Sequence, residues 1–352
     1  MNKITLSILT IAISGVAFTQ VDRNAFVETF TSSTCPPCNP GNIALENLLD
    51  DTVNDGKTVS IKYQVNWPGN GDPYYTSEAG ARKNVYGVVG VPETEVDGTI
   101  YNGGPSSLTQ GHLNQSYGTA AKADISAYYQ VDELSQTVNV QIDFEAIEAI
   151  TVGARLFTAI FEYETVNNTG GNGETEFFHV MKKMVPTASG SIIFSMNPGD
   201  TDSKQESYTF AGNYRLPPDA GSPIDHNIEH SVEEFSDLGV AVWIQNPGTK
   251  EVYQAVYAIQ GYDPLGVEEQ DEIVSAKVYP NPTETKATIA FHSTVADNVA
   301  IEVYNNSGQL VFSEEISDVV VGRNTYVLNT ENCAVGLYTV RIGNQNKRLS
   351  IQ

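Results

Sequence analysis

Residues 25–38 read Ala-Phe-Val-Glu-Thr-Phe-Thr-Ser-Ser-Thr-Cys-Pro-Pro-Cys, and this stretch decides the fold of the first part of the chain. Its first six positions are mostly apolar, as in a buried strand. The cysteines at 35 and 38 follow directly, and apolar residues then recur at helical spacing between 43 and 49. The stretch therefore predicts a strand that leads into a Cys-Pro-Pro-Cys motif at the start of a helix.

The spacing of Cys35 and Cys38 indicates redox chemistry. Two intervening residues let both sulfurs meet across the first helical turn, where the free backbone N–H groups and the helix dipole favour a thiolate. Cys35, nearer the N-terminus, is the expected attacking thiol, and Cys38 would resolve a mixed disulfide by internal attack. A permanent structural disulfide is the alternative. A zinc site is disfavoured, because neither a second cysteine pair nor a nearby histidine accompanies the motif.

The next hundred residues alternate between helical and strand patterns. Residues 59–65 alternate as a strand should, residues 67–75 form a Gly/Pro-rich loop, and residues 77–86 suit a helix. A hairpin turn is expected at Asp97-Gly98, and a short helix after Pro105. The part of the chain from 20 to 121 is therefore expected to be a mixed α/β unit.

Residues 25–100 resemble a thioredoxin-like domain: strand, Cys-Pro-Pro-Cys, helix, strand, helix, and then Val91-Pro92 before a strand. The resemblance implies a cis bond between Val91 and Pro92, packed against the disulfide. It implies that Val91 and Pro92, together with Thr34, bind the backbone of an extended protein or peptide substrate. No bound cofactor is implied, because the cysteine pair carries the chemistry.

Two positions in the first strand and motif depart from the family pattern. Thr34 stands where the family usually has an aromatic residue, and Thr29 stands where it has a buried acid. Glu28 is adjacent, but on an alternating strand its side chain should face away from the cysteines.

From 122 to 262 the apolar residues recur at every second position. The alternating segments lie around 138–144, 157–163 and 240–243, and turn clusters such as 167–173 separate them. This pattern predicts an antiparallel β-sandwich. The segment is similar to the second half of a family of thioredoxin-like secreted or outer-membrane proteins. No enzymatic role follows for it.

Residues 263–273 are acidic and predict a solvated linker. Residues 274–352 read as short strands of a second, small β-sandwich. They resemble a type IX secretion sorting domain in three successive blocks, at 279–282 (Tyr-Pro-Asn-Pro), 303–308 and 336–342. The resemblance implies an interaction with the type IX secretion machinery.

The N-terminus predicts export. Lys3 precedes an apolar run at 4–16, and Ala17 and Thr19 stand at −3 and −1 of a cleavage site, so residues 1–19 read as a Sec signal peptide. The run is too short to span a membrane. We expect an extracellular or cell-surface protein that meets membranes only during export or surface attachment.

The net charge of −24, from 43 acidic and 19 basic residues, argues against nucleic-acid binding. An acidic surface favours solubility, and Ca²⁺ binding by a loop such as 199–202 is a second interpretation.

The stretch His226-Asn-Ile-Glu-His230 has the residue pattern of a zinc-peptidase motif. However, apolar residues and histidines alternate with polar residues from 224 to 232, which predicts a strand that would hold the two histidines apart. No metal site is therefore expected. Cys333 is expected to be a small buried apolar residue.

The sequence thus predicts a multidomain protein: an α/β thioredoxin-like domain, an antiparallel β-sandwich and a small β-sandwich sorting domain. Its predicted function is thiol–disulfide exchange through Cys35 and Cys38. The alternative is a non-catalytic extracellular binding protein in which the same fold is a scaffold and the disulfide is structural.

Overall fold

The computed structural model describes residues 21–261 except 169, and residues 273–352 except 284, 295–297, 306–308, 318, 321, 332 and 344. The signal peptide expected at 1–19, nearly all of the linker expected at 263–273, and the turn at 306–308 lie outside the described residues. Within the described residues, no helix has the length and apolar character needed to cross a membrane.

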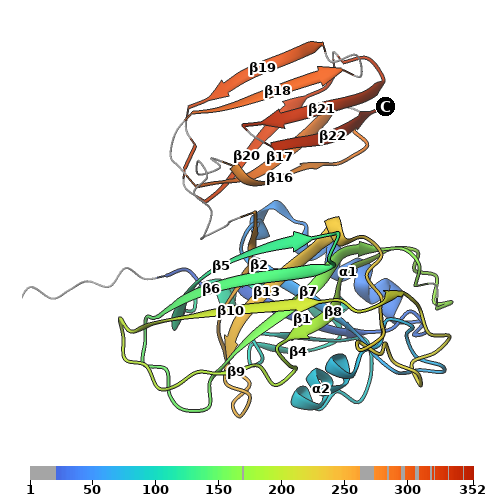
Figure 1. Cartoon of the computed structure of the whole chain (residues 1–352), viewed down its shortest axis with the longest axis vertical. Helices are drawn as coiled ribbons and strands as arrows, with labels where there is room; N and C mark the ends of the chain where they lie inside the picture. The colour runs from blue at the N-terminus through green and yellow to red at the C-terminus, as the bar shows by residue number, and fades with distance from the viewer. Residues whose placement is uncertain are drawn as a thin grey trace, which may run out of the picture.

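One large mixed sheet forms the centre of the molecule (Figure 1). Its strands run in the order β14-β13-β7-β8-β2-β1-β3-β4, and β9 pairs with β7. β1 is parallel to β2 and antiparallel to β3. The strands are β1 (Ala25–Thr31), β2 (Thr58–Gln64), β3 (Glu93–Val96), β4 (Tyr101–Gly103), β7 (Arg155–Thr165), β8 (Phe177–Val185), β9 (Ser191–Ile192), β13 (Leu238–Gln245) and β14 (Val252–Tyr257).

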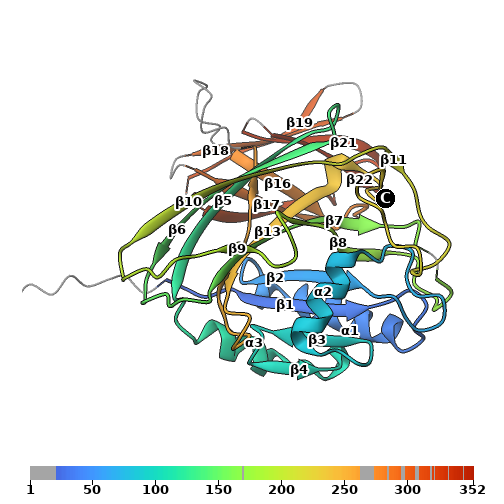
Figure 2. The same ribbon diagram turned by 60° about the horizontal axis from the view of Figure 1, so that its bottom comes forward.

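Helices cover both faces of this sheet, and the side chains of β1 point alternately to one face and the other. Ala25 and Val27 pack into a cluster with leucines of α1 (Cys38–Leu49) and α3 (Gln110–Tyr117). Phe26 and Phe30 belong to the opposite cluster, to which α2 (Ser77–Tyr86) contributes. Figure 2 shows α2 lying across β1 and β2. β1 is buried at every position, because both of its faces are covered.

The elements expected in this part are confirmed, including the helix at 77–86 and the hairpin at Asp97-Gly98. Asp97 and Gly98 have φ of 51° and 69°, and β3 pairs antiparallel with β4 after the turn. The loop between the paired residues Val96 and Tyr101 spans 97–100, and Asp-Gly supplies the positive φ at its first two positions at low cost. Short 3-10 turns lie at Thr52–Asn54, Pro105–Ser107 and Phe235–Asp237.

A second sheet packs against the large one. It runs in the order β10-β6-β5-β15, and an apolar core lies between it and the inner residues of β7 and β13. β2 pairs directly with β8, so strands from both sides of the predicted boundary at 121/122 belong to the large sheet. The strands outside the large sheet are β5 (Ala123–Asp132), β6 (Thr137–Ala146), β10 (Thr201–Thr209), β15 (Ile259–Gln260), and the small pair β11 (Asn213–Tyr214) and β12 (Glu229–His230).

The C-terminal strands form a separate unit, drawn in orange and red in Figure 1. Two sheets, β16-β17-β20 and β19-β18-β21-β22, enclose one apolar core. Cys333 is free and packs against this core, but it is half-buried rather than buried as expected. The strands are β16 (Ile273–Tyr279), β17 (Lys286–Ser293), β18 (Val299–Asn305), β19 (Leu310–Ile316), β20 (Gly322–Asn329), β21 (Gly336–Ile342) and β22 (Gln345–Ile351).

The prediction of a mostly β chain with several sheets is confirmed. The strand expected through His226 and His230 is wrong. Residues 226–228 form a turn, closed by the carboxylate of Asp225, and only Glu229 and His230 are in a strand. Ile228 is consequently 65% exposed rather than buried on an alternating face.

Candidate functional site

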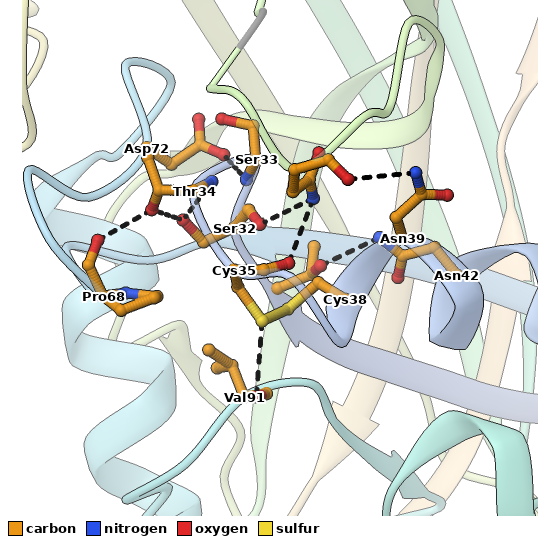
Figure 3. The surroundings of a disulfide bond; sticks show 12 residues. Ser32, Ser33, Thr34, Cys35, Cys38, Asn39, Asn42, Pro68, Asp72 and Val91 are labelled. Carbon is orange, nitrogen blue, oxygen red and sulfur yellow. Dashed lines mark hydrogen bonds between the residues drawn. A yellow bond between two sulfur atoms is a disulfide. The ribbon is translucent and has the colours of Figure 1, made fainter.

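A disulfide joins Cys35 and Cys38 at the start of α1 (Figure 3). A tight turn precedes the helix, in which the Cys35 N–H donates to Ser32 O at 3.0 Å and the Cys38 N–H to Cys35 O at 3.0 Å. Pro37 caps the helix with φ −73°. Proline suits this position because its missing N–H would have no helical partner. The sulfurs thus lie at the positive end of the α1 dipole.

The disulfide lies against the peptide that joins Val91 to Pro92. This peptide is cis, as the resemblance implied, and Cys35 Sγ is 3.4 Å from the Val91 carbonyl oxygen. Gly41 of α1 permits this approach, since a Cβ there would lie 3.0 Å from Pro92 Cγ. Val91 and Pro92 are half-buried, so both have surface left to meet a ligand.

Both cysteines are nearly inaccessible. Cys35 is 1% exposed and Cys38 is fully buried, whereas Pro36 and Pro37 between them are exposed. A thiolate must reach its target in line with the sulfur–sulfur bond, so a partner protein can react with Cys35 only after local movement.

Thr34 is half-buried and holds the motif to the preceding Gly/Pro-rich loop. Its Oγ1 donates to Pro68 O at 2.8 Å and lies 2.7 Å from Ser32 Oγ. The aromatic residues of this loop pack inward: Tyr74 is 1% exposed, and Trp67 packs against the core cluster. These rings therefore belong mainly to the packed interior rather than to a ligand-binding surface.

The same loop places a buried carboxyl group beside the motif. Asp72 is fully buried, and its Oδ2 accepts the Ser33 N–H at 2.7 Å while Oδ1 accepts the Tyr74 N–H at 2.9 Å. Burial raises the pKa of Asp72 to about 7, against the opposing effect of these hydrogen bonds. Figure 3 shows Asp72 directed at Ser33, on the opposite side of the motif from the sulfurs.

A loop from the β-rich part of the chain lies along the motif. We call residues 168 and 170–174, between β7 and β8, the strap. Asn172 is its centre: its N–H donates to Ser33 O at 3.0 Å, and its Nδ2 lies 3.2 Å from both Ser32 O and Cys35 O. Gly170 lies so close that a Cβ would come within 2.2 Å of Ser33 Oγ. The strap therefore fixes the backbone of the turn that holds Cys35.

The two ends of the strap are anchored as well. Glu174 accepts from Asn42 Nδ2 of α1 at 2.6 Å and from Asn172 Nδ2 at 2.5 Å. Asn168 is buried, accepts from Ser33 Oγ at 2.9 Å and donates to Asp72 at 2.5 Å. The Asn172 carbonyl accepts from Asn39 Nδ2 at 3.2 Å. Strap, α1 and motif thus form one hydrogen-bonded network.

The side chains that flank the motif on β1 follow the predicted alternation. Thr29 lies 2.9 Å from Thr94 through their hydroxyl oxygens. Glu28 points to the α2 face, where Arg82 and Tyr63 bind it. Glu28 therefore takes no part in the cysteine site.

Among the described residues, no group of histidine, cysteine and acidic side chains is arranged to hold a metal ion. His226 Nε2 lies 3.5 Å from Glu78 Oε2, whereas His230 Nδ1 accepts the Val232 N–H at 3.3 Å. The two histidines thus have separate partners.

Sequence reasoning identified the residues around the disulfide but missed Asp72 and the strap. Both lie in loops that the sequence marks only as turn clusters, and their contacts join residues 39 to 140 positions apart. A Gly-Gly-Asn-Gly run at 170–173 was the visible signal. Such a run permits close backbone approach, but it does not identify the surface approached.

Solved structures were compared with the chain. HBP35 of Porphyromonas gingivalis is similar with a TM-score of 0.51 and 17% identity, covering 94% of this chain and 98% of that protein. A mutant β-glucosidase from Listeria innocua in complex with laminaribiose has a TM-score of 0.19 and 12% sequence identity, and the match covers 42% of this chain and 17% of that one. Dimeric latent PorU from Porphyromonas gingivalis has a TM-score of 0.20 and 10% sequence identity, and the match covers 78% of this chain and 37% of that one. These two scores carry no argument. No curated protein matches the sequence.

Residues 277–352 match the family model described as the secretion system C-terminal sorting domain. This match covers the two-sheet unit from Lys277 onward, and it implies an interaction with the type IX secretion machinery. The chain therefore carries a C-terminal sorting domain and is exported by type IX secretion to the cell surface or the extracellular space.

Proposed function

We propose that the chain is an exported thiol–disulfide oxidoreductase whose residues 20–121 form a thioredoxin-like unit. The parallel β1–β2 pair, the antiparallel β3–β4 extension and helices on both faces support this fold. The observation that carries the function is the contact between Cys35 Sγ and the Val91 carbonyl oxygen, at the positive end of α1. It places the cysteine pair, a disulfide in this structure, against the peptide between Val91 and Pro92, both of which are half-buried.

In this proposal, the reduced pair reacts with a protein disulfide. The Cys35 thiolate attacks one substrate sulfur, a mixed disulfide forms, and the substrate's other sulfur leaves as a thiolate that takes up a proton. The Cys38 thiolate then attacks Cys35 Sγ, which releases the second substrate thiol and closes the Cys35–Cys38 disulfide. Two electrons pass from the pair to the substrate, and the reverse sequence oxidises a substrate dithiol.

The chain's own groups have defined tasks in these steps. The α1 dipole stabilises the thiolate, and the Val91 carbonyl can accept a hydrogen bond from the Cys35 thiol when the pair is reduced. Thr34, Val91 and Pro92 would contact the substrate backbone.

A structural disulfide in a binding protein is the second candidate, and the burial of both sulfurs favours it. In that case the strap and motif are one fixed assembly, and the thioredoxin-like fold is a scaffold for contacts elsewhere on the surface.

The reduction potential of the Cys35–Cys38 couple distinguishes these candidates. The mature protein is equilibrated in glutathione buffers, and the thiols are counted by alkylation. We expect a value between about −120 and −270 mV, the range of working oxidoreductases. A value below about −300 mV, or no reaction without denaturant, would identify a structural disulfide.

Two variants tie the measurement to the pair. Cys35→Ser should abolish exchange with a model protein disulfide. Cys333→Ser is the matched control, because it removes the free thiol of the sorting domain and should leave exchange unchanged.

A further inference from the structure

The strap supplies a carboxylate to the start of the helix that carries the cysteines. Glu174 is half-buried and bonds to Asn42 within α1. The Asn172 amide that bonds to Glu174 also reaches the Cys35 carbonyl, so one amide group separates the carboxylate from the motif. The positive end of the helix dipole favours a thiolate at the cysteines. A negative charge placed here offsets that positive potential and so disfavours the thiolate.

We propose that Glu174, held in place by Asn172, is a positioning residue that disfavours the thiolate of the Cys35–Cys38 pair and thereby keeps the pair oxidised. This inference rests on the proposed function for its biological meaning, since it names a residue that shifts the reduction potential of the Cys35–Cys38 couple. It requires that the reduced form carry negative charge on sulfur, whereas the disulfide carries none. The carboxylate therefore destabilises the reduced form alone.

Two features of the strap support a charge effect rather than simple packing. Among the described residues, the ionisable groups that hydrogen-bond to the motif or the strap are Asp72 and Glu174, and both are acidic. Glu174 already acts at a distance on its neighbours, because its charge contributes to the raised pKa of Asp72. The three glycines at 170, 171 and 173 let the strap lie flat on the motif and bring the carboxylate close.

Glu174→Gln tests the proposal, because it removes the charge and keeps a side-chain oxygen for Asn42 and Asn172. We expect the equilibrium constant for oxidation by glutathione to fall about threefold to tenfold, a tenfold change being about 30 mV for a two-electron couple. The shift should be larger at pH 9 than at pH 7, since more of the reduced pair is then thiolate. The pKa of the Cys35 thiol, measured from the pH dependence of alkylation, should fall.

Glu176→Gln is the matched control. Glu176 lies two residues further along the same loop, is exposed, and acts electrostatically on Glu164 rather than on the motif. It should leave the equilibrium constant for oxidation by glutathione within about twofold of the parent value at both pH values. A second variant, Asn172→Ala, releases the strap from the Ser32 and Cys35 carbonyls and should shift the potential in the same direction as Glu174→Gln.

The outcomes separate this inference from the proposed function. A Glu174→Gln potential that equals that of Glu176→Gln, or a shift that does not grow with pH, overturns the inference even if the parent works as an oxidoreductase. If the parent potential lies below about −300 mV and Glu174→Gln still raises it, the charge effect stands and the proposed function fails.

Discussion

Two buried carboxyl groups, Glu28 and Asp72, lie on the same α/β unit in opposite electrostatic settings. Glu28 is 1% exposed and is held by the guanidinium of Arg82, with contacts of 2.6 to 3.0 Å. Asp72 is fully buried and is bound by neutral donors, the Ser33 and Tyr74 N–H groups and the Asn168 amide. Charge compensation, rather than burial, therefore distinguishes the two.

The difference separates a stabilising cluster from a titratable site. A buried carboxylate that keeps its cation is costly to break, and Arg82 is itself fully buried against Trp243 and Phe157. Asp72 lies within electrostatic reach of Lys182 but is hydrogen-bonded only by neutral groups, and it takes up a proton near neutral pH, as its raised pKa indicates. The titratable group is the one that touches the cysteine motif.

The largest expected effect comes from removing the cation. Arg82→Met should lower the free energy of unfolding by about 3–5 kcal/mol at pH 7, because Glu28 would remain buried and uncompensated. Urea unfolding measures the loss. The control is Lys204→Met, which breaks the partly exposed pair with Asp202 and should cost under about 1 kcal/mol. Equal losses in the two variants would mean that Glu28 does not depend on Arg82.

The sequence predicted the Glu28 side of this comparison better than the Asp72 side. Strand alternation was enough to direct Glu28 away from the cysteines, because a side chain's face on β1 depends on local geometry alone. The helices, the hairpin and the disulfide partners were also local patterns. The position of Asp72 depends on how the loop at 67–75 folds back onto Ser33, and no residue spacing encodes that.

The strap and the shared sheet were missed for the same reason. The pairing of β2 with β8 joins residues more than a hundred positions apart, and the alternation of each strand is the same whether they belong to one sheet or two. The Gly-rich run that forms the strap read only as a turn. Sequence periodicity thus predicted the elements and the cysteine pair, while long-range packing decided what surrounds the pair.

The second expected effect concerns pH. Between about pH 4 and 7 the folded state keeps the proton on Asp72 while the unfolded chain loses it, so this group's contribution to stability falls as pH rises through that window and is constant above it. The full change is about 4 kcal/mol, from the difference between a pKa of 3.8 and one of about 7. Asp72→Asn should remove this slope, so that the parent loses stability relative to the variant as the pH rises from 4 to 7.

Unfolding free energies at several pH values check this, and the difference between parent and variant isolates Asp72 from other titrating groups, such as His179, whose burial lowers its pKa to about 4. Asp202→Asn is the control, because the hydrogen bond from Lys204 holds the Asp202 pKa below its ordinary value. Its profile should run parallel to that of the parent between pH 4 and 7. If the stability profile of Asp72→Asn also runs parallel to that of the parent, Asp72 is ionised throughout this pH range, and its neutral hydrogen-bond donors are enough to stabilise the buried carboxylate.

The smallest expected effect comes from removing a hydroxyl group that donates to Glu28, which measures how much hydroxyl donors contribute to stabilising this carboxylate. Tyr63 donates to Glu28 Oε1 at 2.9 Å, and Tyr63→Phe removes that bond while Arg82 and Tyr86 remain. The expected loss of unfolding free energy is about 1–2 kcal/mol, since a hydrogen bond to a charged group is lost but the charge stays compensated. Tyr101→Phe, which loses an exposed bond to Gly104 O, should cost less. A loss from Tyr63→Phe as large as that from Arg82→Met would mean that hydroxyl donors stabilise Glu28 as strongly as its cation does, and the contrast with Asp72 would then not be one of charge.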